Sequence, residues 1–306
     1  MANATSQPGG KEPEINSNPQ LQSYYQSLES RVGYRLMLGG TRHFGYWDHD
    51  TYWPFPFSKG LRNMEDKMAQ ALELPAGSTV LDAGCGVGHV ALRMAKAHGL
   101  HVKAIDVTEH HVVKAQNNIK RSGLSDDVIS AQRMDYHHLE SFADANFDGI
   151  YTMETFVHAT DPKVVLAGFY RLLKPGGRLV QFEYEHDPFQ EATKDLADSM
   201  VKINQYSAMP TNAVSHAGVF KKMLEDAGFE DVTVRNYSEN IRPMTRAFFL
   251  FAIVPYLFVR LFGLERHFIN TVAGVESYRG RDHWRYVAIS ATKPGGTTEA
   301  STTGCS

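Results

Sequence analysis

A glycine-rich turn between a predicted strand and a predicted helix constrains this chain more than any other feature. The segment LDAGCGVGH, Leu81 to His89, carries glycines at positions 84, 86 and 88. Glycine reaches backbone conformations that other residues avoid, so such a turn lets the main chain approach a ligand closely. A plain tight turn is the alternative interpretation. We expect a ligand to bind here because the neighbouring segments agree with that prediction.

Strand-like and helix-like segments alternate along the chain. Apolar segments predict strands at 79–84, 101–107, 128–135, 147–155, 178–184, 231–238 and 283–293. Helical spacing of apolar residues predicts helices at 58–74, 87–99, 109–123, 161–173 and 215–230. This alternation predicts an α/β fold, a Rossmann-like, seven-stranded, mostly parallel sheet with helices on both faces. Ligands bind such a sheet at the carboxyl ends of its strands.

The length of 306 residues suits one large domain between two polar ends. Residues 1–20 are predicted to be a disordered leader and residues 294–306 a disordered tail. Between them, residues 21–293 are predicted to form a single domain. Its parts are a helical lid (21–74), a cofactor-binding core (75–187) and a substrate-side cover with the last strands (188–293).

Composition and charge exclude several partners. The net charge of -3 and the lack of a Lys/Arg-rich run argue against nucleic acid. No zinc-type histidine spacing occurs, so no metal is expected. Two cysteines and a polar start without a signal sequence favour a cytoplasmic location. The apolar run near 247–262 is too short to span a bilayer. It is predicted to cover a pocket, touch a membrane surface or pack in the core; the oligomeric state stays open.

Acidic residues end three successive predicted strands: Asp82, Asp106 and Asp135. Asp82 would face a positive charge on a ligand and repel a pyrophosphate, and the glycine spacing is G-x-G-x-G rather than the dinucleotide G-x-G-x-x-G. S-adenosylmethionine carries an ammonium and a sulfonium. Asp106 follows Gly84 by 22 residues. In this architecture an acid at that position accepts hydrogen bonds from the ribose hydroxyls of the ligand. Asp135 is placed to accept from an adenine amino group.

This arrangement resembles the class I S-adenosylmethionine-dependent methyltransferases over about residues 75–185. The KPGG turn at 174–177, before the fifth strand, is another signature of that superfamily. The resemblance implies S-adenosylmethionine as cofactor. It also implies cofactor contacts for Asp82, Gly84, Gly86, Gly88, Asp106, Val107, Asp135 and Tyr136.

Two further segments resemble the sterol C-24 and tocopherol-type methyltransferases. One is HFGYW, residues 43–47, in a stretch crowded with aromatic residues. The other is the end of the fourth strand, where Glu154 and His158 match the spacing of an acid and a histidine in that group. The aromatic residues predicted to line a substrate pocket are Tyr24, Tyr25, Phe44, Tyr46 and Trp47. A cluster that only packs helices together is the alternative.

The predicted catalytic residues are His158, Glu154 and Glu183. Methylation of a hydroxyl needs a base within hydrogen-bond reach, a role that suits His158. Methylation of an alkene develops charge on carbon, which aromatic rings and the carboxylate of Glu154 or Glu183 would stabilise. The structural alternatives are a histidine bonded to backbone, a salt-bridged acid at 154 and a solvated strand exit at 183.

The sequence therefore predicts transfer of a methyl group to carbon or oxygen of a lipophilic small molecule, such as a sterol, another terpenoid or a polyketide. The alternative is an enzyme that binds S-adenosylmethionine without methylating anything. Such an enzyme would fold a lipophilic substrate for cyclisation or rearrangement, with the cofactor as a fixed positive charge.

Overall fold

The computed structural model describes residues 18–27, 29, 38–188 and 192–295. Residues 1–17 of the predicted leader and 296–306 of the predicted tail lie outside this part of the chain. The last residues of the predicted leader are helical, because α1 begins at Pro19.

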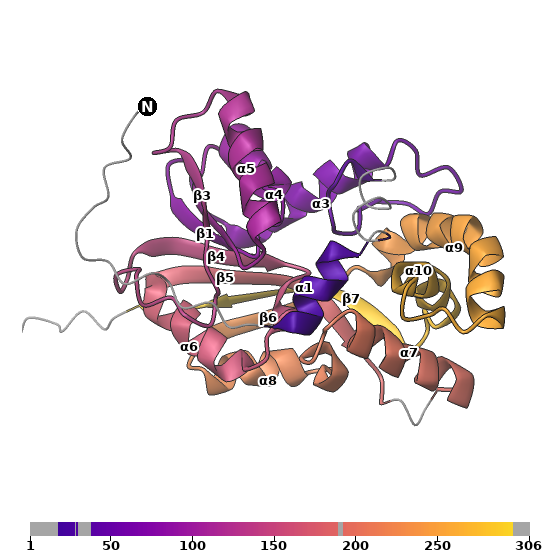
Figure 1. Cartoon of the computed structure of the whole chain (residues 1–306). Coiled ribbons are helices and arrows are strands. Elements are labelled where there is room, and N and C mark those ends of the chain that lie inside the picture. The colour runs from indigo at the N-terminus through magenta and orange to yellow at the C-terminus, as the bar shows by residue number, and fades with distance from the viewer. Residues whose placement is uncertain (1–17, 28, 30–37, 189–191, 296–306) are drawn as a thin grey trace, which may run out of the picture.

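Seven strands form one sheet in the order β3-β2-β1-β4-β5-β7-β6 (Figure 1). The strands are β1 (Thr79–Ala83), β2 (His101–Asp106), β3 (Ile129–Arg133), β4 (Phe147–Met153), β5 (Leu173–His186), β6 (Glu230–Asn236) and β7 (Trp284–Thr292). Strands β1 to β5 pair in parallel, and β7 is antiparallel to both β5 and β6. The predicted seven-stranded, mostly parallel sheet is confirmed.

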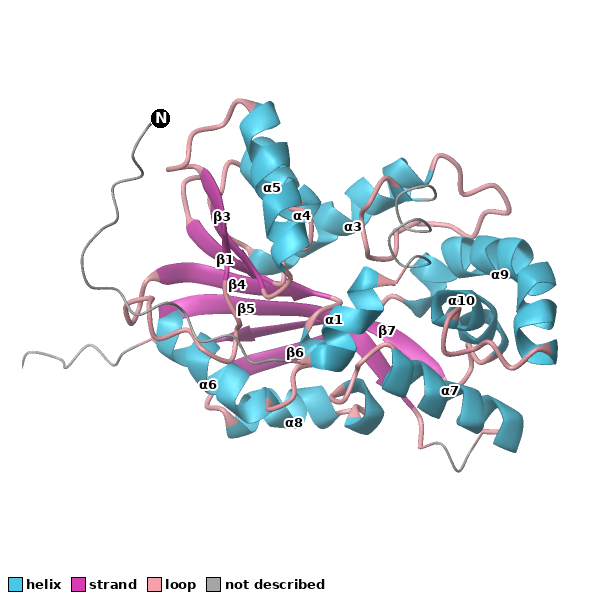
Figure 2. Cartoon of the chain, in the orientation of Figure 1, coloured by secondary structure: helices cyan, strands magenta, loops and turns pink. Residues whose placement is uncertain are grey.

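Helices cover both faces of this sheet (Figure 2). One face carries α3 (Phe57–Leu72), α4 (His89–His98) and α5 (Glu109–Ser122), and the other carries α6 (Pro162–Leu172) and α8 (Val219–Asp226). Met64 and Met68 of α3 are fully buried in the first core, and Phe169 and Phe220 occupy the second. The two apolar cores hold the strand ends rigidly in place.

A further group of helices lies beyond the carboxyl edge of the parallel strands (Figure 1). It consists of α1 (Pro19–Gln26), α7 (Lys194–Tyr206), α9 (Ser238–Leu261) and α10 (Ile269–Arg279), with the short helices η1 (Phe156–His158) and η3 (Asn212–Val214) nearby. This group takes α1 from the predicted lid (21–74) and α7, α9 and α10 from the predicted cover (188–293), and it encloses the site described below. Helix α3, also within the predicted lid, packs on the face of the sheet instead.

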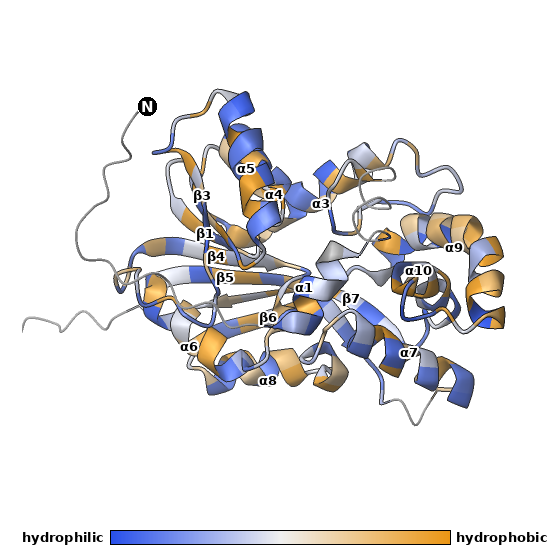
Figure 3. Cartoon of the chain, in the orientation of Figure 1, coloured by the Kyte–Doolittle hydropathy of each residue, from blue (hydrophilic) through white to orange (hydrophobic). Residues whose placement is uncertain are grey.

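Helix α9 is longer than the predicted apolar helix at 247–262. It runs for 24 residues and contains two prolines, Pro243 and Pro255. In the described part of the chain, α9 is long and apolar enough to cross a membrane by length and composition, with 28% of its most apolar window buried. It packs against α10, and the exposed side is strongly apolar (Figure 3). That side presents Leu250, Val254, Leu257, Phe258 and Leu261.

The predicted turn at 174–177 lies inside β5 rather than before it. The register between β4 and β5 shifts between Phe147 and Gly149, and Gly176 adopts a left-handed φ of +77°. The four residues therefore form a bulge in a longer strand. The KPGG sequence correctly predicted irregular backbone at 174–177. It did not predict that strand β5 is already paired with β4 before these residues.

Candidate active site

The glycine turn joins β1 to α4 through left-handed backbone. The φ angles of Gly84, Gly86 and Gly88 are +108°, +53° and +81°. A Cβ on Gly84 would lie 2.6 Å from Oγ1 of Thr155, whereas a Cβ on Gly86 would meet no atom within 4 Å. Gly88 brings two helices together instead, since its Cβ would lie 3.1 Å from that of Ala115 in α5. The turn is thus open toward a ligand at Gly86.

Asp82 is buried at the end of β1 and is only 2% exposed. Among the described residues its Oδ2 atom has no hydrogen-bond partner of good geometry. Burial raises the pKa of Asp82 to about 7, an effect that the neighbouring Tyr151 hydroxyl offsets in part. A buried carboxylate is stabilised by a nearby cation. Asp82 therefore fits a ligand ammonium group.

Asp106, at the end of β2, is held by three donors. Its Oδ2 accepts from the Gly86 amide at 2.9 Å, and its Oδ1 from the Thr108 amide at 2.7 Å. The His111 ring lies 3.4 Å from Oδ1. Burial opposes ionisation, but the bonds from His111, Thr108 and Gly86 outweigh it and hold the pKa of Asp106 below its ordinary value. The carboxylate therefore stays charged and also fixes the glycine turn.

A small cavity of about 50 Å³ lies at these strand ends. Five of the predicted cofactor residues line it: Gly84, Asp106, Val107, Asp135 and Tyr136. Leu21 and Tyr25 of α1 close it from outside. Ligand pockets usually span about 300–1,000 Å³. The small cavity is therefore below the usual volume of a ligand pocket, and α1 occupies its outer side.

Asp135 and Tyr136, after β3, both make internal hydrogen bonds. Oδ1 of Asp135 accepts from the His137 amide at 2.9 Å and lies 2.6 Å from the His137 ring. The Tyr136 hydroxyl donates to the Thr155 carbonyl at 3.0 Å. Both residues line the small cavity, where adenine was expected, and these bonds fix their side chains.

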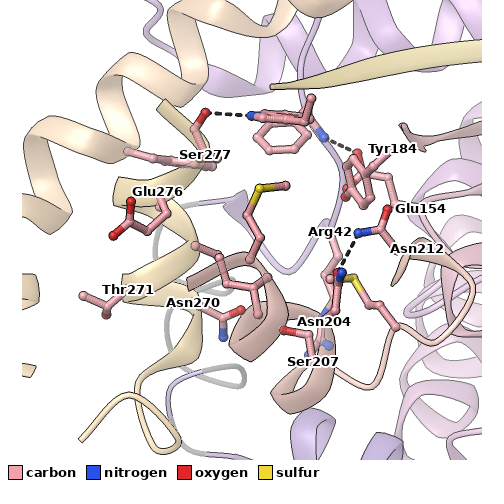
Figure 4. Close-up of a pocket in the computed structure, with 18 of the residues that line it drawn as sticks. Arg42, Glu154, Tyr184, Asn204, Ser207, Asn212, Asn270, Thr271, Glu276 and Ser277 are labelled. Carbon is pink, nitrogen blue, oxygen red and sulfur yellow. Dashed lines mark hydrogen bonds between the residues drawn. The ribbon is translucent and has the colours of Figure 1, made fainter. Parts of the chain in front are cut away.

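A larger cavity of about 410 Å³ lies next to it, between the sheet edge and the helical cover (Figure 4). Its walls come from α1, α7, α9, α10, the end of β5 and the segment before α3. The main apolar wall residues are Tyr24, Phe44, Met200, Phe248, Phe251 and Trp284. Such a cavity suits a largely apolar small molecule.

Glu154 lies at the inner end of the large cavity with a left-handed φ of +57°. Oε1 accepts from the Phe44 amide at 2.7 Å and the Tyr286 hydroxyl at 2.9 Å, while the Tyr184 hydroxyl donates to Oε2. Burial raises the pKa of Glu154, and nearby His43 and these donors offset part of the rise. The carboxylate is already bound by three donors, so its first role is to fix the cavity wall.

His43, at the start of the predicted HFGYW segment, forms a buried link to a second acid. Its Nε2 atom lies 3.4 Å from Oε1 of Glu65 in α3, and its Nδ1 atom lies 2.9 Å from the Phe44 carbonyl. Burial opposes protonation, but Glu65 and Glu154 outweigh it and raise the pKa of His43. The segment before α3 is thereby anchored between two carboxylates.

His158 separates the two cavities, because it lines both of them together with Tyr25. Its Nδ1 atom lies 2.8 Å from the Ala208 carbonyl, which can only accept, so Nδ1 carries the proton. Nε2 then accepts from the Tyr25 hydroxyl at 3.0 Å. Burial lowers the pKa of His158 to about 4, so the ring is neutral near pH 7. A neutral ring with a lone pair at Nε2 is able to accept a proton.

Glu183 lines neither of the two cavities, although Glu185 lines the large one. Oε1 of Glu183 accepts from the Phe156 amide at 2.8 Å and the Thr155 amide at 3.2 Å, so it holds the turn into η1. Burial raises the pKa of Glu183 to about 8. Its predicted role beside a developing charge gains no geometric support. Side chains alternate along β5, so Glu183 points to the opposite face from Tyr184.

The predicted aromatic pocket divides into two groups. Tyr24, Tyr25 and Phe44 line the large cavity. Tyr46 and Trp47 do not: Tyr46 stacks edge-on against a tyrosine before α9, and Trp47 packs against Gly60 of α3. Tyr46 and Trp47 therefore agree with the alternative prediction for these aromatic residues, a cluster that only packs helices together.

Sequence reasoning missed several polar residues of the large cavity, namely Asn204, Ser207, Asn212, Asn270 and Glu276. The signal available for α7 was a polar residue, Asn204, beside the apolar positions Met200 and Ile203. A buried asparagine on an otherwise apolar helix face indicates a specific partner.

The comparisons with known proteins agree with this geometry. The family model described as a methyltransferase domain matches residues 81–181. The fold, the glycine turn and the strand-end acids are those of the class I S-adenosylmethionine-dependent methyltransferases, and the chain belongs to this family of enzymes, whose cofactor is S-adenosylmethionine.

Particular relatives are more informative. The chain is 47% identical to the S-adenosyl-L-methionine-dependent Diels-Alderase iccD of Talaromyces variabilis, over 90% of this chain and 94% of that one. It is 46% identical to the S-adenosyl-L-methionine-dependent Diels-Alderase iliD of Neonectria sp., over 73% of this chain and 87% of that one. The [4+2]-cyclase SpnF has the same fold, with a TM-score of 0.69 and 23% sequence identity. The match covers 93% of this chain and 100% of that one. The predicted family is confirmed, whereas the likeness to sterol enzymes is loose.

The residues of this chain fit the cofactor. The unpartnered Oδ2 of Asp82 suits its ammonium group, and the open side of Gly86 leaves room for the methionine part. Asp106 and Val107 would hold the ribose, and Asp135 and Tyr136 the adenine. When bound, S-adenosylmethionine supplies an activated methyl group and a fixed positive charge.

Proposed function

We propose that this enzyme catalyses an intramolecular [4+2] cycloaddition of a lipophilic linear substrate and does not transfer the methyl group of S-adenosylmethionine. The observation that carries the proposal is the identity of 47% over 90% of the chain to an enzyme named as an S-adenosylmethionine-dependent Diels-Alderase. In this reaction the three π bonds of a diene and an alkene in one molecule become two new carbon–carbon σ bonds and one π bond between the inner diene carbons. No atom or proton enters or leaves.

The large cavity supports this proposal through its shape and lining. An intramolecular cycloaddition is accelerated when the two reacting ends are held together in one folded conformation. A mostly apolar cavity of about 410 Å³, walled by Phe44, Phe248 and Phe251, suits a folded hydrocarbon chain. Its rigid back wall at Glu154 is fixed by three hydrogen bonds.

The polar groups at the boundary also agree with a reaction that moves no proton. Glu154 is bound by three donors, and the lone pair of His158 at Nε2 is taken by the Tyr25 hydroxyl. Tyr25 and His158 stand between the two cavities. This partition would keep the substrate away from the activated methyl group.

Incubation with methyl-labelled S-adenosylmethionine and a panel of linear lipophilic polyenes tests the proposal. We expect a cyclic product with the same mass as the substrate and without label. A labelled product that is heavier by one methyl substitution would contradict it.

Methyl transfer to a hydroxyl is the second candidate, because neutral His158 lies at the boundary of both cavities with its proton on Nδ1. Rotation of the Tyr25 hydroxyl away from Nε2 would free a base for a substrate hydroxyl. The chain is also 27% identical over 69% of its length to the O-methyltransferase resE of Aspergillus sclerotiorum. The same labelling experiment separates the two candidates.

A further inference from the structure

Two asparagines lie side by side on one wall of the large cavity (Figure 4). Asn204 belongs to the last turns of α7, and Asn212 begins η3. Nδ2 of Asn212 donates to Oδ1 of Asn204 at 2.6 Å. Both residues are more than nine-tenths buried. The polar atoms that the pair does not use between its own two carboxamides need another partner.

Each carboxamide offers one amino group and one carbonyl oxygen, and their mutual bond uses one of each. Among the described residues, Nδ2 of Asn204 and Oδ1 of Asn212 are buried without a hydrogen-bond partner. If both amides were turned over, the bond would reverse and again leave one amino group and one carbonyl. A buried polar group without a partner costs about 1–3 kcal/mol. The pair therefore always presents one donor and one acceptor to a ligand.

The main chain around the pair is fixed by hydrogen bonds to its carbonyl oxygens. The Asn204 carbonyl accepts from the Met209 amide at 2.8 Å. The Asn212 carbonyl accepts from the Ser215 amide at 3.1 Å and lies 2.7 Å from Nε2 of His186. The backbone carbonyls of both asparagines are thus already bonded, and the polar atoms without a partner are on the carboxamide ends.

We propose that Asn204 and Asn212 together bind the polar end of the substrate, a group that carries a carbonyl oxygen and an N–H on one edge, as in a primary amide or a lactam. The substrate carbonyl accepts a hydrogen bond from the free amino group of the asparagine pair, and the substrate N–H donates one to the free carbonyl oxygen of the pair. The inference rests on the proposed function for the lipophilic rest of the substrate, which lies against the aromatic walls.

This contact also has a chemical consequence for the cycloaddition. A hydrogen bond to a carbonyl withdraws electron density from a conjugated alkene, which makes that alkene a better partner for a diene. The same contact determines which end of the substrate lies next to α7. Asn204 and Asn212 would therefore set both the orientation of the substrate and part of its reactivity.

Competition binding with two small probes tests the inference. Dodecanamide carries a carbonyl and an N–H on one edge, and N,N-dimethyldodecanamide keeps the carbonyl but lacks the N–H. Each is titrated against wild-type protein containing a fluorescent apolar reporter, N-phenyl-1-naphthylamine. We expect dodecanamide to bind about tenfold more tightly, which corresponds to one lost hydrogen bond. Equal affinities would overturn the inference and leave the proposed function standing.

The double variant Asn204→Leu, Asn212→Leu should lose this preference and bind both probes with similar affinity. Asn63→Leu is the matched control, because the Asn63 amide bonds to the Tyr46 carbonyl outside the cavity. The control should keep the preference. A preference that persists in a folded double variant, or in Asn204→Ala if the double variant does not fold, would contradict the inference. If neither probe displaces the reporter from wild-type protein, the lipophilic cavity and the proposed function fail instead.

Discussion

The two cavities of this enzyme are built in opposite ways. The small cavity is lined by Gly84 after β1 and by the acids Asp106 and Asp135 at the ends of β2 and β3. Asp106 is fixed there by its bonds to the Gly86 and Thr108 amides. The large cavity is assembled from α1, α7, α9 and α10, segments that are distant in the chain. The first region carries the residues predicted to bind S-adenosylmethionine. The second is the region that would hold the substrate under the proposed function.

The largest expected effect belongs to the cofactor region. Asp82→Ala should weaken binding of S-adenosylhomocysteine about 100-fold, because the ligand ammonium loses a buried carboxylate. The fold should persist, since Oδ2 of Asp82 accepts no hydrogen bond of good geometry from the described residues and burial disfavours its charged form. Calorimetric titration measures the affinity. Asp148→Ala is the control, because Asp148 accepts from the Thr79 amide at the opposite end of β1 and lines neither cavity. Unchanged affinity in Asp82→Ala would remove this residue from the cofactor site.

The next effect is a pH dependence that belongs to the same carboxyl group. Burial raises the pKa of Asp82 to about 7 in the free protein, so the group gains a proton as the pH falls below 7. The ligand ammonium binds the charged form, so affinity should fall from pH 7 to pH 5.5, by up to about tenfold per pH unit. Asp82→Asn should remove this slope. A flat profile in the wild-type protein would show that Asp82 does not titrate against the ligand.

A change at the boundary between the two regions should have a smaller effect. His158→Ala removes the neutral ring that Tyr25 contacts, yet a cycloaddition needs no base. We expect the cyclisation rate to fall less than about tenfold while cofactor affinity stays the same. A general base contributes about 10²–10⁴-fold. A loss of that size in His158→Ala would favour methyl transfer over cycloaddition.

The smallest effect concerns the wall formed by α9. Phe251 lines the large cavity although 55% of it is exposed, so Phe251→Ser should weaken binding of a lipophilic probe about threefold to tenfold with little change in stability. Leu250→Ser is the matched control, because Leu250 is 65% exposed and does not line the cavity. Equal loss of affinity in both variants would mean that the probe binds the outer face of α9.

The same pair of variants tests the predicted membrane contact of residues 247–262, which stays a prediction together with the cytoplasmic location. If the exposed side of α9 meets a lipid surface, both variants should sediment less with phospholipid vesicles than the wild-type protein. The control Val164→Ser removes an exposed apolar side chain of α6 and should not change sedimentation. Vesicle binding that is unaffected by either α9 variant would exclude this face.

The cofactor region could be predicted from the sequence because its determinants are local. Strand period, helix period and the glycine turn fixed the order of elements, and parallel strands bring the ends at Asp82, Asp106 and Asp135 to one edge. One detail was misleading: Gly88 packs against Ala115 instead of facing a ligand. Nothing in the spacing of three glycines distinguishes these two uses.

The substrate region could not be predicted to the same depth because its determinants are long-range. The start of α9 was missed, since Pro243 is of a residue type that usually ends or kinks a helix, and here the helix continues through it and packs against α10. The direction in which Tyr46 and Trp47 point depends on neighbours far along the chain. The unpaired atoms of Asn204 and Asn212 exist only in the folded structure, so no sequence pattern announces them.

The central claim is that S-adenosylmethionine is required but not consumed, and a turnover count tests it most directly. Enzyme loaded with one equivalent of S-adenosylmethionine is given a large excess of a linear polyene that it converts, and product and S-adenosylhomocysteine are both quantified. The account predicts many product molecules per cofactor molecule and no accumulation of S-adenosylhomocysteine. One S-adenosylhomocysteine for each product, with conversion stopping when the cofactor is spent, would contradict it.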